Sequence, residues 1–135
     1  MNIAFIRFTL AKRHPDSGVE DGLFGLAYAL QDDPAVDAQD RRILTDHLEW
    51  FETNLPKPDR FSRSQSKGYY RRSTRGIAWF RDSATECLSH MHHIKDILEA
   101  QGHQVTMLCE TRVGNFVYED AFQVVAEPFS DTRTR

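Results

Sequence analysis

Cations and aromatic side chains are interleaved in one stretch of the sequence, between residues 57 and 81. The stretch holds eight lysines or arginines and a single acid, a formal charge of +7, whereas the remaining residues carry a net charge of −10. The whole-chain charge of −3 therefore hides a basic segment on an acidic chain. Phosphates bind cations, and unstacked bases lie on flat aromatic rings. The residues that we expect to contact a polyanion are Arg60, Arg63, Lys67, Tyr69, Tyr70, Arg71, Arg72 and Arg75.

Two other interpretations of this basic segment stay open. The cations could neutralise an acidic helix predicted over residues 37–54, with the tyrosines packed on the core. They could also bind an acidic protein partner. No recognised nucleic-acid-binding motif is present in the sequence, so the hypothesis of a polyanion contact, and of nucleic acid in particular, rests on composition alone.

Other residue types that often carry chemistry give weaker patterns. His90, His92 and His93 are clustered, but there is no HExxH motif, and only His90 and His93 lie roughly on one helix face. Cys87 and Cys109 are not in CxxC spacing, and we expect both to be buried thiols. The sequence also lacks a P-loop, a GxGxxG and a GxSxG motif. We therefore expect no metal, no cofactor and no catalytic centre.

Hydrophobic periodicity predicts the elements that must position these residues. Helices are predicted to begin at a capping box at Ser17, at Asp37 and at a second capping box at Ser83, and Gly102 is expected to end the last one. The predicted strands are Asn2–Thr9, Gly76–Phe80, Val105–Cys109, Asn115–Tyr118 and Phe122–Ala126.

The basic segment is predicted to form a partial hairpin. Its strands would run over Arg60–Ser64 and Tyr69–Thr74, with a turn near Ser66–Gly68. Because side chains alternate along a strand, Tyr69 and Arg71 would share one face and Tyr70 and Arg72 the other.

The order of elements predicts an α+β fold. The strand at 76–80, the helix at 83–101 and the strand at 105–109 form a predicted βαβ unit with parallel strands and a right-handed crossover. A β-meander follows. We expect a single domain over residues 1–129, with a mixed sheet of about five strands packed with three helices, and a mobile tail over residues 130–135.

The composition also predicts the compartment. No apolar stretch approaches the ~20 residues that a membrane helix needs, and the N-terminal residues lack the pattern of a signal peptide. Two cysteines are compatible with a reducing environment. We expect a soluble cytoplasmic protein with no membrane partner.

Two sequence blocks carry a resemblance to a known family. Residues 67–84 (KGYYRRSTRGIAWFRDSA) and 117–129 (VYEDAFQVVAEPF) resemble blocks shared by an uncharacterised family of short bacterial proteins. The likeness extends over most of the chain. It implies a bacterial cytoplasmic protein and no particular chemistry.

A second resemblance concerns the order of Arg7, Ser73-Thr74 and Glu119. This order is similar to that of arginine-specific ADP-ribosyltransferases, in which the arginine holds the dinucleotide phosphates and the glutamate stabilises a developing oxocarbenium ion. The family's Ser-Thr-Ser is Ser-Thr-Arg here, and its paired glutamates are absent. The transferase therefore stands as an alternative to a binding protein.

Overall fold

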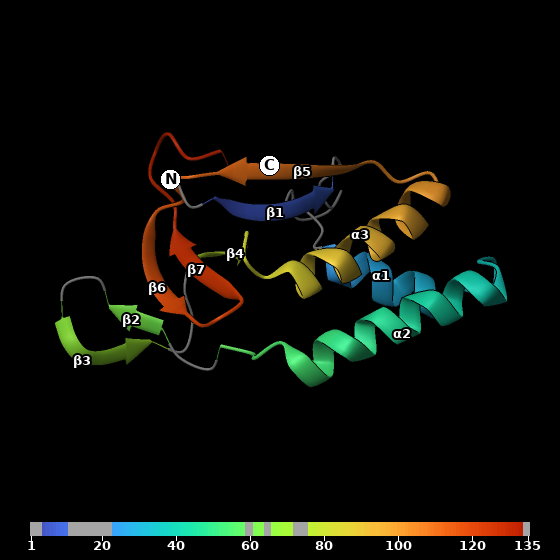
Figure 1. Ribbon diagram of the computed structural model, residues 1–135, viewed down its shortest axis with the longest axis horizontal. Coiled ribbons are helices and arrows are strands. Elements are labelled where there is room, and N and C mark those ends of the chain that lie inside the picture. The colour runs from blue at the N-terminus through green and yellow to red at the C-terminus, as the bar shows by residue number, and fades with distance from the viewer. Residues whose placement is uncertain (1–3, 11–22, 59–60, 64–65, 72–75, 134–135) are drawn as a thin grey trace. The chain divides into compact units, whose positions relative to one another are not determined.

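The computed structural model describes residues 4–10, 23–58, 61–63, 66–71 and 76–133 (Figure 1). These residues form three α-helices, a five-stranded antiparallel sheet and a separate two-stranded ribbon, which confirms the α+β class. Within the described residues, no helix has both the length and the apolar character needed to cross a membrane.

The chain forms two compact units. Unit 1 comprises Met1–Arg7, Pro56–Thr85 and Leu108–Thr134, and unit 2 comprises Phe8–Leu55 and Glu86–Met107. The expectation of a single domain over residues 1–129 stays a prediction.

The five-stranded sheet has the order β5-β1-β4-β7-β6. Register is set by paired apolar residues, with Trp79 opposite Val124 and Ile77 opposite Ala126. The strands are β1 (Phe5–Leu10), β4 (Ile77–Arg81), β5 (Val105–Glu110), β6 (Asn115–Glu119) and β7 (Gln123–Glu127).

The predicted βαβ unit differs in one respect from the structure. Strand β1 lies between β4 and β5 and pairs antiparallel with β4, so β4 and β5 are not neighbours. The sheet is consequently antiparallel and not mixed. The predicted hairpin of the last two strands is confirmed, because β6 and β7 pair antiparallel.

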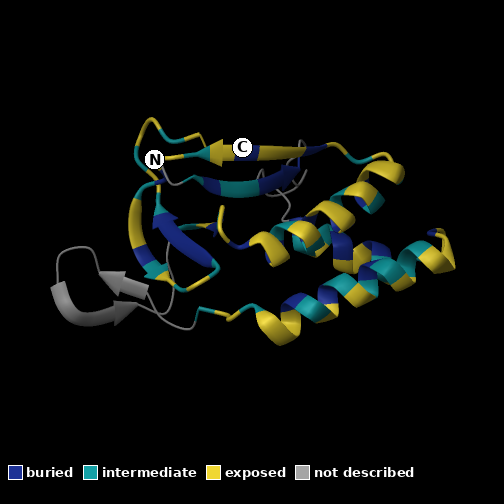
Figure 2. Cartoon of the chain, in the orientation of Figure 1, coloured by how far each residue is buried: buried dark blue, intermediate teal, exposed yellow. Residues whose placement is uncertain are grey.

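The core of unit 1 lies on one face of these strands. It contains Phe5, Trp79, Leu108, Val113, Val124 and Ala126, with Ile77 packed against it. Strand β7 is buried over four consecutive residues, Gln123–Ala126, as Figure 2 shows. Gly114, which comes directly before β6, lies against Glu127 at the end of β7. Its φ is +128°, and a Cβ at this position would overlap the carbonyl oxygen of Glu127. The backbone conformation and the close strand end both require glycine there.

The helices belong mainly to unit 2. They are α1 (Leu23–Gln31), α2 (Ala38–Asn54) and α3 (Thr85–Ala100). Hydrophobic periodicity predicts a stripe of Leu44, Leu48, Phe51 and Leu55 here; the first three are buried, whereas Leu55, at the C-cap, is half-buried. On α3 the same periodicity predicts a stripe of Ala84, Cys87, Leu88, Met91, Ile94 and Leu98, and all of these are buried except Leu88, which is half-buried.

The helix ends confirm two of the predicted caps. Asp37 is the N-cap residue of α2, although its side chain makes no capping hydrogen bond. Helix α3 begins at Thr85, and the capping box at Ser83 stays a prediction. Gly102 ends α3 with φ +91°, and the amides of Gly102 and His103 donate to the carbonyls of Glu99 and Leu98 in a Schellman motif. The capping box at Ser17 lies outside the described residues.

The C-terminal tail is described as far as Arg133. Arg112 pairs with Asp131 at 2.8 Å, and Arg133 pairs with Glu110 at 2.8 Å. Both ion pairs are exposed, and such pairs contribute little to stability. The expected mobility of residues 130–135 stays a prediction.

Candidate functional site

The basic segment forms an antiparallel β-ribbon in unit 1. Strand β2 (Phe61–Arg63) pairs with β3 (Ser66–Arg71), with Phe61 opposite Arg71 and Ser62 opposite Tyr70. The two strands make a sheet of their own, and β2 lies next to β6. The predicted hairpin is therefore confirmed. We call it the β2–β3 ribbon.

The turn of this ribbon differs from the prediction. Ser66, Lys67 and Gly68 were expected to form the turn, but they belong to β3, and Arg63 pairs with Ser66 across a register shift. A bulge of this kind bends a strand and increases its twist. The return strand therefore starts three residues earlier than the pattern of serine, lysine and glycine indicated.

The expected contact residues are distributed over the ribbon and its flanks. The strands contain Arg63 on β2 and Lys67, Tyr69, Tyr70 and Arg71 on β3. Arg60, Arg72 and Arg75 lie outside the described residues.

Two further cations of the basic segment are described in detail. Lys57 is exposed. The Nε of Arg81 donates to the backbone carbonyl of Asp120 at 2.8 Å, and its Nη2 lies 3.8 Å from the carboxylate of Glu119. Arg81 is thus part of the β6–β7 turn, and we do not count it among the cations available to a polyanion.

Asp120 organises that turn. Its Oδ1 accepts hydrogen bonds from the amides of Phe122 and Gln123 at 2.8 and 3.0 Å. Its Oδ2 accepts from the hydroxyl of Tyr118 at 2.7 Å and from Nε2 of Gln123 at 3.2 Å. Burial acts to raise the pKa of Asp120, but the hydrogen bonds from Tyr118, Phe122 and Gln123 outweigh it and lower the pKa. Buried Gln123 also donates to the carbonyl of Pro56 at 2.8 Å, which ties the turn to the segment entering the ribbon.

The residues of the transferase-like pattern have the following positions. The Nη1 of Arg7 is 3.4 Å from the carbonyl of Ala78, to which it donates. Glu119 is exposed and faces Arg81. Ser73 and Thr74 lie outside the described residues. The described contacts of Arg7 and Glu119 are thus with strand β4, and the transferase-like pattern stays a prediction.

A second cluster of functional groups lies in unit 2, and the sequence pattern missed one member of it. His47 on α2 reaches His90 on α3, with 2.7 Å between their Nδ1 atoms, and its ring centroid is 4.7 Å from that of His93. His92, by contrast, packs edge-on against Phe8. In the described part of the chain, no group of three or more His, Cys, Asp or Glu side chains has the arrangement of a metal site. The only signal for His47 was its place beside the buried stripe of α2.

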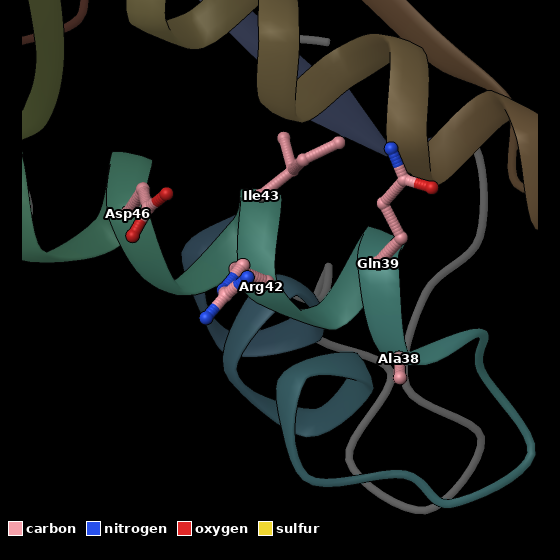
Figure 3. Close-up of a pocket in the computed structure, with 5 residues that line it drawn as sticks. All are labelled: Ala38, Gln39, Arg42, Ile43 and Asp46. Carbon is pink, nitrogen blue, oxygen red and sulfur yellow. The ribbon is translucent and has the colours of Figure 1, made fainter.

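A shallow groove of about 650 Å³ runs along α2 (Figure 3). All of its lining residues come from this one helix, and they are Ala38, Gln39, Arg42, Ile43 and Asp46. With one cation, one anion and an open side, the groove does not indicate a ligand class.

The two cysteines differ in exposure. Cys87 is buried on α3, as predicted. Cys109 is exposed on β5, so the prediction of a buried thiol at this position is wrong. Strand β5 is at the edge of the sheet, and an edge strand has fewer neighbours to cover its side chains.

Comparison with known proteins yields no match to a protein-family model, a curated protein or a solved structure.

Proposed function

We propose that this protein binds nucleic acid, and single strands in particular, through the β2–β3 ribbon and the cations next to it. The support comes first from charge. The segment from residue 57 to residue 81 carries +7, whereas the rest of the chain carries −10. Such a concentration of cations attracts phosphates even when the whole protein is acidic.

The observation that carries the proposal is the register of the ribbon. Phe61 is opposite Arg71 and Ser62 is opposite Tyr70, and the register shift follows between Ser62 and Arg63. An aromatic residue of β2 and a cation of β3 are thus partners across the two strands. The ribbon thus combines Lys67, Tyr69, Tyr70 and Arg71 on β3 with Phe61 on β2, and these residue types include the cations and flat rings that single strands require.

A salt titration of binding tests the proposal. Fluorescence anisotropy of a labelled 20-nucleotide single strand, as DNA and as RNA, gives the association constant at several salt concentrations. The slope of log K against log salt is negative, and its magnitude grows with the number of phosphate contacts. Replacing both Arg71 and Arg72 by alanine should reduce this magnitude by about 1–2, because phosphate contacts are lost. Tyr69→Ala should weaken affinity by ~1–3 kcal/mol with little change in slope, because stacking is lost.

A matched control keeps the interpretation specific. Arg42→Ala removes an exposed cation from α2 and should leave the slope unchanged. If the wild type shows no salt-dependent binding and the double arginine variant melts several degrees lower, the cations act within the molecule and the proposal is wrong. An acidic protein that still co-purifies after nuclease treatment would favour instead the interpretation that the basic segment binds a protein partner. Thermal stabilisation by NAD without nucleic-acid binding would favour the transferase.

A further inference from the structure

Helices α2 and α3 meet at a pair of histidines. The Nδ1 atoms of His47 and His90 are 2.7 Å apart, and the ring centroids are 4.9 Å apart. Trp50 stacks on His90 at a centroid distance of 4.1 Å and an interplanar angle of 19°. Phe51, which is buried, lies edge-on to the same ring at 6.0 Å. The pair is thus the polar contact in an aromatic junction of the two helices.

A hydrogen bond between two imidazole nitrogens restricts protonation. One Nδ1 must carry the hydrogen and the other must present a lone pair. One added proton is compatible with the bond, because an imidazolium can still donate to a neutral ring. A second added proton places two N–H groups and two positive charges face to face, and the bond cannot survive.

The surroundings oppose charging of the pair. Burial is the largest influence on both rings and lowers the pKa of His47 and of His90. His93 on α3 also lowers the pKa of both histidines. Asp46 on α2 acts to raise the pKa of His47, and Glu86 on α3 acts to raise the pKa of His90. The net direction is downward for both histidines, so the closed pair resists protonation relative to free histidine.

We propose that His47 and His90 form a proton-sensitive latch that holds α2 against α3 and is released when both rings are protonated. The latch does not depend on nucleic-acid binding. Its release frees Trp50 from the stack on His90 and opens the junction beside Phe51. Acidification would therefore loosen unit 2 at this one contact before it unfolds the chain.

The direction and size of the effect follow from linkage. In the open form each histidine has an ordinary pKa of about 6.5, whereas the closed pair has lowered values. Stability of the junction is thus fully present above pH ~6.5 and is lost as pH falls below it, because the open form binds more protons. Each proton that the open form binds in excess of the closed form raises the equilibrium constant for opening about tenfold for every unit by which the pH falls. The expected rise in this constant is roughly 10- to 100-fold between pH 7 and pH 5.

Native-state hydrogen exchange of the α2 and α3 amides measures this opening. Exchange is followed at several pH values from 7.5 to 5.0, with a chelator present and with correction for intrinsic rates. The wild type should lose protection near His47 and His90 by roughly 10- to 100-fold beyond that correction. His47→Asn places a non-titrating amide near the position of Nδ1 and should remove most of this pH dependence.

Two further variants complete the experiment. His92→Gln is the control, because His92 is an exposed histidine of α3 whose ring contacts Phe8 and not the pair. This variant should behave as the wild type. His90→Asn tests the other half of the pair if His47→Asn does not fold. The latch is refuted if a folded His47→Asn or His90→Asn variant keeps the wild-type loss of protection at low pH, or if the wild type shows no such loss.

Discussion

The carboxylate of Asp120 offers the sharpest test of how the β6–β7 turn is held. Four donors converge on its two oxygens, at distances between 2.7 and 3.2 Å. Asp120→Asn replaces one acceptor oxygen by an amide group, which must face two of these donors whichever way it is oriented. A hydrogen bond to a charged group contributes ~1.5–3 kcal/mol, and the Tyr118 hydroxyl can rotate to recover part of the loss. We expect the free energy of unfolding to fall by about 2–4 kcal/mol at pH 7.

The pH dependence of the same variant gives a second measure. The hydrogen bonds lower the pKa of Asp120, so the stability that the ionised group contributes is present above the unfolded pKa of about 3.9. This contribution is lost as pH falls from that value through the lower folded pKa. The difference in the free energy of unfolding between the wild type and Asp120→Asn should therefore become smaller at low pH.

Urea denaturation followed by circular dichroism at pH 7 and at pH 3 measures both effects. Glu119→Gln is the matched control, because its carboxylate is 60% exposed and 3.8 Å from Arg81, and an exposed pair of this kind contributes ~0–1 kcal/mol. Equal losses in the two variants at pH 7 would show that the convergence of donors on Asp120 does not stabilise the turn.

Two other predictions concern the packing of each unit. Gly114→Ala should destabilise by about 2–3 kcal/mol in urea denaturation, because its φ of +128° and the overlap of a Cβ with the Glu127 carbonyl both oppose a side chain; a loss below ~0.5 kcal/mol would contradict this. Met91→Ala should cost ~2–4 kcal/mol because Met91 is 2% exposed, whereas His92→Ala should change stability by less than ~0.5 kcal/mol. Similar decreases in melting temperature for the two variants would mean that α3 does not bury the face that contains Met91.

Much of the local structure was predictable from the sequence. The stripe of Leu44, Leu48 and Phe51 identified α2, and Gly102 identified the end of α3, because helical periodicity and a left-handed cap depend on residues a few positions apart. The β6–β7 hairpin, the hairpin of the basic segment and the separation of charge along the chain depend on near neighbours in the same way.

Only the tertiary structure decided the long-range arrangement. The insertion of β1 between β4 and β5 depends on pairing between residues more than seventy positions apart, and no local pattern reports such pairing. The exposure of Cys109 follows from the edge position of β5, and not from the apolar residues around it in the sequence. The histidine pair depends on the packing of α2 against α3, which brings together two residues 43 positions apart. The spacing of residues determines which face a side chain occupies on its own helix, whereas the partner of that face is chosen by the packing of the whole unit.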